Sequence, residues 1–104
     1  MATHRIIVSP AADSDIWEAV QYISITLGNP VAAQRMLDLI EKQYGLLEQN
    51  PRMGTGYTTN NGKVYRYVIA GNYMMFYTVT DTDVVIQRFL FAPSNISVRL
   101  DREL

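Results

Sequence analysis

The sequence predicts an α+β domain with an N-terminal strand, an antiparallel helical hairpin and then a three-strand antiparallel meander. Two helix-initiation signals, Ser9-Pro10 and Asn29-Pro30, each precede apolar residues at helical spacing. The run from Val64 to Phe91 is almost all strand formers, broken at Gly71-Asn72 and Asp81-Thr82. The chain has 104 residues, which is the size of one domain, so we expect residues 1–104 to fold as a single unit.

The first strand and the first helix follow from short local signals. Arg5 to Val8 is apolar and β-branched, and so predicts a strand. Ser9 can accept a hydrogen bond from a free N–H of a helix that begins at Pro10. Gly28 is suited to end this helix. The apolar residues of the helix lie on one face and are Ile16, Val20, Ile23 and Leu27.

The second helix is expected to begin after Asn29 and to end before Asn50-Pro51. Its apolar stripe comprises Ala33, Met36, Leu37, Ile40, Tyr44 and Leu47. Because the link between the two helices is so short, they must run antiparallel.

The second half of the chain predicts strands joined by tight turns. Met53 to Gly62 is rich in Gly, Thr and Asn and predicts a loop. Gly71-Asn72 and Asp81-Thr82 can each form a two-residue hairpin turn between the strands that follow. A short terminal segment from Pro93 is compatible with a helix.

Two arginines interrupt the apolar strands and raise the question of function. Counting outward from the two turns places Arg66 opposite Tyr77 and Arg88 opposite Met75, on one face of the sheet. The opposite face is uncharged and aromatic, so we expect it to lie against the helices. Each arginine either packs its stem on the sheet with its head in water or paired to a carboxylate, or contacts an anion such as phosphate.

Composition excludes several classes of function. The chain has no cysteine and one histidine, His4, so no disulfide, zinc site or cofactor is expected. There is no apolar run of about 20 residues and no secretory signal, so we expect a cytoplasmic protein without a membrane partner. The net charge of −1 conceals six acids against three bases in residues 1–50, and six bases against four acids afterwards. An anionic partner would therefore approach the second half.

Four segments, in this order, resemble the RelE/ParE superfamily of toxins from bacterial type II toxin–antitoxin, or plasmid-stabilisation, modules. They are "SPAADSDIWEAVQYI", "LGNPVAAQRMLDLIEKQYGLLEQNPRMG", "YRYVIAGNYMMFYTV" and "VVIQRFLF". The resemblance covers nearly the whole chain and implies a small α+β toxin that inhibits growth and is held inactive by a cognate antitoxin wrapped over its surface. Trp17, Tyr22 and Met36 are the residues that we expect the antitoxin to contact.

The resemblance leaves the target open, because RelE-like members cut messenger RNA on the ribosome whereas ParE-like members poison DNA gyrase. This chain lacks the late basic residues and late histidine of many RNA-cleaving relatives, and Ala92-Pro93-Ser94-Asn95 stands in their place. We therefore favour ParE-like inhibition of gyrase by binding. The alternatives are a ribosome-dependent endoribonuclease that uses Arg66, Arg88 and Tyr77 as catalytic residues, and an attenuated antitoxin-binding domain. Both a homodimer and a toxin–antitoxin hetero-oligomer fit the sequence.

Overall fold

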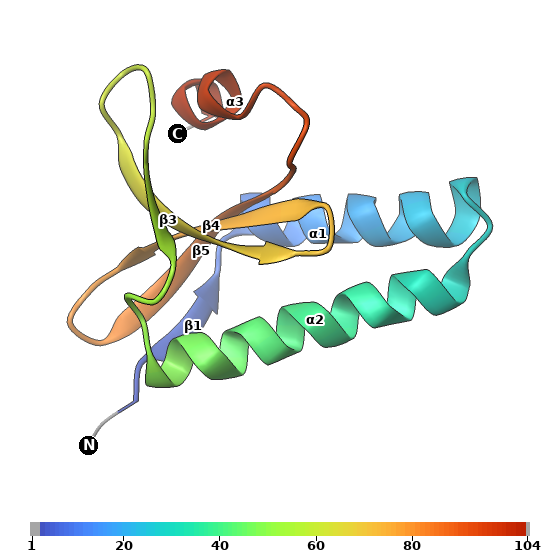
Figure 1. Ribbon diagram of the computed structural model, residues 1–104, viewed down its shortest axis with the longest axis horizontal. Helices are drawn as coiled ribbons and strands as arrows, with labels where there is room; N and C mark the ends of the chain where they lie inside the picture. Colours follow the sequence, from blue (N-terminus) through green and yellow to red (C-terminus); the bar gives the residue numbers. More distant parts are fainter. Residues whose placement is uncertain (1–2, 104) are drawn as a thin grey trace.

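The computed structural model describes residues 3–103 and contains one five-stranded sheet with helices on both faces (Figure 1). The elements follow in the order β1 (Arg5–Val8), α1 (Pro10–Gln21), α2 (Pro30–Gln49), β2 (Thr55–Thr58), β3 (Val64–Ala70), β4 (Tyr73–Val79), β5 (Asp83–Phe91) and α3 (Ile96–Glu103). A π-helical turn, Tyr22–Thr26, extends the end of α1. The strand order in the sheet is β1-β5-β4-β3-β2, with β1 parallel to β5 and the other neighbours antiparallel. The predicted α+β class is confirmed, and the predicted elements occur in the expected order.

The helix caps form as the sequence predicts. Ser9 Oγ accepts a hydrogen bond from the Ala12 N–H at 3.1 Å, and Asn29 Oδ1 accepts one from the Ala32 N–H at 3.1 Å. Gly28 has a φ of 62°, a left-handed conformation that glycine adopts without strain, and the chain reverses there into α2. The two helices therefore form the expected hairpin, which lies along one side of the sheet (Figure 1).

The prediction of an unstructured loop between α2 and β3 is wrong in part. Thr55–Thr58 form β2, which pairs antiparallel with β3 and places Gly56 opposite Arg66. Thr55, Tyr57 and Thr58 are residue types that favour strands, but the run is only four residues long and contains Gly56, and its pairing with β3 establishes it as a strand. The result is an edge strand that extends the sheet beyond the predicted meander.

The prediction of which sheet face lies against the helices is also wrong. The core beneath α1 and α2 contains side chains that were expected on the face away from the helices, namely Val68, Met75, Tyr77, Val84 and Ile86. The aromatic face is covered instead by α3, whose Ile96 and Leu100 pack with Tyr65 and Phe76. Because both faces of the sheet are buried, aromatic content did not distinguish them.

A β-bulge changes the position of Arg88. Pairing from Val79–Val84 to Tyr77–Ile86 follows the two-residue turn as counted, but the register shifts between Phe76 and Tyr77. Beyond the shift, Phe76 pairs with Arg88 and Met75 pairs with Phe89. The extra residue in β5 moves Arg88 onto the α3 side and Phe89 onto the helical-hairpin side, because successive side chains in a strand alternate between faces. The expected pairing of Arg88 with Met75 is therefore wrong, whereas that of Arg66 with Tyr77 is confirmed.

The helices of residues 3–103 do not reach the combination of length and hydropathy that crossing a bilayer requires.

Candidate functional site

Arg66 and Tyr77 meet at Gly54, in the segment that follows α2. Arg66 Nη1 donates hydrogen bonds to the carbonyl oxygens of Gly54 at 2.9 Å and Arg52 at 3.2 Å. The Gly54 N–H donates to the Tyr77 hydroxyl oxygen at 2.9 Å. A Cβ at Gly54 would lie only 2.5 Å from that oxygen and 2.7 Å from the Tyr67 carbonyl, so glycine is needed for the close approach. Together these contacts fasten the 52–54 segment to the sheet.

Tyr77 is buried among core residues and is not placed to meet a substrate. Its side chain packs with the residues beneath α1 and α2 and has no exposed surface. Burial raises the pKa of the Tyr77 hydroxyl, while the bond from Gly54 and the charge of Arg66 lower it by less. The hydroxyl therefore stays protonated at neutral pH and acts as a hydrogen-bonding clamp.

Arg88 is held in a buried ion pair with Asp15 of α1. Arg88 Nε and Nη2 donate to the two Asp15 carboxylate oxygens at 2.7 and 2.8 Å, a bidentate geometry. The Arg88 side chain is 4% exposed and that of Asp15 is 9% exposed. Asp15 Oδ2 also accepts the Phe89 N–H at 3.0 Å. Since β1 pairs with β5 only as far as Ile86, Asp15 occupies the part of the β5 edge that β1 leaves uncovered.

The three residues expected to be catalytic do not form one site. Arg66 and Tyr77 lie near each other on the helical-hairpin side of the sheet, because they pair across β3 and β4. Arg88 lies beyond the bulge and pairs with Phe76, which belongs to the α3 side. Both arginines stand out in the sequence, whereas Asp15 was not predicted as the partner of Arg88. The available signal for this pairing was that Asp15 is an acid in the first half of α1, the helix that lies beside the edge of β5.

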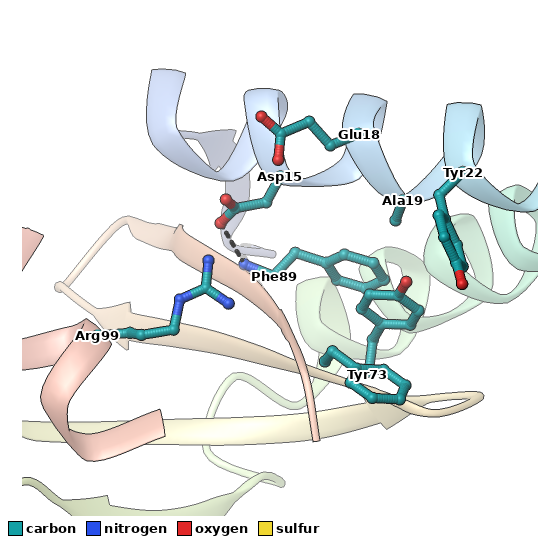
Figure 2. A pocket seen from close by; sticks show the side chains of 8 residues that line it. Asp15, Glu18, Ala19, Tyr22, Tyr73, Phe89 and Arg99 are labelled. Carbon is teal, nitrogen blue, oxygen red and sulfur yellow. Dashed lines mark hydrogen bonds between the residues drawn. The ribbon is translucent and has the colours of Figure 1, made fainter. Parts of the chain in front are cut away.

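A depression of about 300 Å³ lies between α1, β5 and α3 (Figure 2). Figure 2 shows Asp15, Glu18 and Ala19 along α1 and Tyr22 at the start of the π-helical turn, with Arg99 reaching toward them from α3. Tyr73 stacks on Phe89 with 4.8 Å between ring centroids and 3° between planes, and forms the apolar part of the wall. Burial, and then the nearby Tyr22 hydroxyl, raise the pKa of Tyr73.

An apolar groove of about 250 Å³ continues from this depression over the end of the helical hairpin at which the chain turns from α1 into α2. We name it the hairpin groove, and it is lined by Tyr22, Ile23, Leu27, Ala32, Arg35, Met36, Leu39, Gly71, Asn72, Tyr73 and Phe91. Several lining side chains are large, apolar and open to solvent, including Leu27 at 57% and Tyr22 at 51% exposure. Of the described residues, no group of three or more His, Asp or Glu is placed to hold a metal ion. The groove is therefore a surface suited to contact with another polypeptide.

The residues expected to contact an antitoxin occupy different positions around this groove. Tyr22 lines it, and Trp17 lies in a neighbouring depression with Tyr22 and Ile25. Met36 lines the groove floor but is 7% exposed, so it supports the surface more than it projects from it. Leu27, Leu39 and Phe91 also line the groove and were not among the residues predicted to contact the antitoxin. Leu39 could have been recognised as an exposed apolar residue, because it lies off the apolar stripe of α2.

Comparison with known proteins is consistent with this architecture. A family described as "ParE toxin of type II toxin-antitoxin system, parDE" matches residues 6–91, from the second residue of β1 to the last residue of β5. The chain belongs to the ParE toxin family. No curated protein sequence gives a significant match.

Among solved structures, a chain of the "Chromosomal ParDE TA system from P. aeruginosa" is similar to this ParE family member, with a TM-score of 0.65 and 16% sequence identity. The alignment covers 86% of this chain and 96% of the other. At this identity the likeness supports the ParE-type fold.

Proposed function

We propose that this ParE family member inhibits DNA gyrase by binding to it, without chemistry of its own, and is neutralised by a cognate antitoxin. The observation that carries the proposal is the use of Arg88 and Tyr77 inside the fold. Arg88 forms a buried ion pair with Asp15, and the Tyr77 hydroxyl oxygen accepts a hydrogen bond from the Gly54 N–H. Neither is placed to transfer a proton to or from a substrate, so binding remains the better-supported mode of action.

The hairpin groove is the surface that we assign to the antitoxin. A helix or extended segment with apolar anchors can bury Leu27, Tyr22 and Phe91, which are otherwise exposed to water. Covering exposed apolar side chains is favourable by about 25 cal/mol for each Å² removed from water. At one end of the groove, Glu18 and Arg99 supply charged groups that can fix the register of the segment.

The ribonuclease alternative keeps one supporting observation. Arg66 and Arg52 line a common depression, and a pair of guanidinium groups can contact a phosphate. The net charge of −1 gives little counterion-release gain from ribosomal RNA, which weakens this alternative.

Purified chain is therefore tested in parallel on two targets. We expect it to inhibit negative supercoiling of relaxed plasmid by gyrase, and to leave messenger RNA intact on translating ribosomes. Cleavage on ribosomes without any effect on gyrase would contradict the proposal. Growth arrest on induction of the chain alone completes the test, because a soluble, non-toxic chain would indicate the attenuated antitoxin-binding domain.

The antitoxin surface is tested with a matched pair of variants. Leu27→Ser removes an exposed leucine from the groove, and Leu46→Ser removes one that is 45% exposed on α2 and does not line the groove. Co-expression with the open reading frame adjacent to this gene should rescue growth in the Leu46→Ser strain and rescue it poorly in the Leu27→Ser strain. Equal rescue of both strains would place the antitoxin elsewhere.

A further inference from the structure

A second depression of about 250 Å³ lies on the helical-hairpin side of the sheet, where the chain leaves α2 and enters β2. Its polar lining includes Arg52 and Arg66, and Val64, Thr78 and Val79 form part of the remaining wall. No carboxylate lines it among the described residues. The depression therefore carries positive charge only.

Arg66 is fixed in place but keeps donors to spare. Its Nη1 is engaged by the carbonyl oxygens of Arg52 and Gly54, which hold the guanidinium plane against the segment. Its Nε and Nη2 make no hydrogen bond with the described residues, although Arg66 is partly buried. A guanidinium group already immobilised by the fold loses less conformational entropy when it binds a ligand.

Arg52 supplies the second charge from the exposed side. Its backbone carbonyl accepts from Arg66 Nη1, so the two residues are coupled through the chain. Its side chain is exposed and makes no ion pair or hydrogen bond with residues 3–103. Two like charges at one depression repel each other, and an oxyanion between them relieves that repulsion while it accepts their hydrogen bonds.

We propose that the Arg52–Arg66 depression binds a carboxylate side chain from an acidic segment of a partner polypeptide. This inference rests on the proposed function in one respect, which is that the molecule bound in the depression is a protein and not a nucleic acid. Arginine is well suited to such a contact, because its planar fork matches the two oxygens of a carboxylate.

The surroundings favour a carboxylate over a nucleic acid strand. Sequence-tolerant binding of single strands relies on exposed aromatic side chains on which bases stack. The two aromatic residues of this depression, Tyr65 and Tyr77, are 5% and 0% exposed, so they offer no stacking platform. The chain as a whole has a net charge of −1, which also disfavours a polyanionic strand.

The test measures binding of two small anionic probes to the full ¹⁵N-labelled chain. The probes are an N-acetylated tetraglutamate amide and tetrauridylate, and the readout is the NMR signals of the arginine Nε–H groups and the Gly54 amide. We expect saturable shifts at Arg52, Arg66 and Gly54 with tetraglutamate, and weaker, unlocalised shifts with tetrauridylate. Arg52→Gln should weaken tetraglutamate binding about tenfold, as expected for one charge-assisted contact.

Arg102→Gln is the matched control, because Arg102 is exposed on α3 and lines a different depression. It should change the affinity less than twofold, within the usual scatter for a remote surface charge. Absence of shifts at Arg52 and Arg66, or equal losses in the two variants, would overturn the proposal. Tighter binding of tetrauridylate at the same residues would overturn it in favour of nucleic acid. Because the measurement uses only the chain and a probe, its failure leaves gyrase inhibition untouched.

Discussion

The buried pair between Arg88 and Asp15 makes a quantitative prediction about stability. Asp15→Asn keeps the size of the side chain but removes the negative charge that compensates Arg88. Arg88 is 4% exposed and cannot reach water without disrupting the contact between α1 and β5. Breaking a buried ion pair by neutralising one partner costs about 3–5 kcal/mol, and a domain of this size has a total unfolding free energy of about 5–15 kcal/mol.

The expected result is a large loss of stability in Asp15→Asn. At about 4–8 °C for each kcal/mol, the thermal midpoint should fall by at least about 12 °C. Circular dichroism during thermal and urea unfolding measures the change, and an unchanged urea slope would show that the folded state itself is retained.

The chain offers a matched control for this experiment. Arg5 and Asp83 form an ion pair with a similar distance of 2.8 Å, but the Arg5 side chain is 74% exposed. Asp83→Asn should therefore cost far less, since water screens the exposed charge. If Asp15→Asn and Asp83→Asn lowered the midpoint equally, burial would not determine the strength of these pairs, and the reasoning would be refuted.

Three further predictions concern the packing around the sheet. Gly54→Ala should destabilise the chain by about 1–3 kcal/mol, because the new Cβ would overpack against Tyr77 and the Tyr67 carbonyl. Gly45→Ala, within α2, should not destabilise the chain, because nothing lies within 4 Å of its new Cβ. Urea unfolding of the two variants compares their free energies of unfolding. Burial raises the pKa of the Tyr77 hydroxyl above its ordinary value of 10.0, so the unfolded chain loses this proton first. The Tyr77 hydroxyl should not affect stability below pH 10.0, and stability should fall as pH rises through the pKa of this group in the folded chain. The fall should be shallower in Tyr77→Phe. A constant difference in stability between the wild-type chain and Tyr77→Phe across this pH range would contradict the prediction. Lys63→Met removes the donor to the carbonyls of Leu100 and Asp101, so amide hydrogen exchange should quicken in α3 and not in β4; unchanged exchange in α3 would show that apolar contacts alone hold this helix.

Local signals in the sequence were enough to predict most of the elements. The starts of α1 and α2 each have a capping side chain followed by proline, and both predicted caps form. The two-residue turns at Gly71-Asn72 and Asp81-Thr82 also form as predicted, and Gly71 has the positive φ of 60° that a tight hairpin turn can require. β2 was not predicted in this way, because its four residues include a glycine and form too short a run to stand out from the surrounding loop, and their pairing with β3 becomes visible only in the sheet.

The candidate site was predictable only in its residue types. Arg66 and Arg88 were recognisable as unusual in apolar strands, and the pairing of Arg66 with Tyr77 followed from one turn. The role of Arg88 depended on a bulge that no local pattern marks and on an acid 73 positions away in the chain.

By itself, the sequence determined the element order, the caps, the turns and a likeness to a toxin superfamily, because each of these depends on residues that are close together in the chain. Only the tertiary structure decided which sheet face lies under the helices, because both faces carry apolar side chains and each is covered. It also decided that Arg88 pairs inside the fold while Arg66 keeps free donors, because one extra residue in β5 moves every later side chain to the other face.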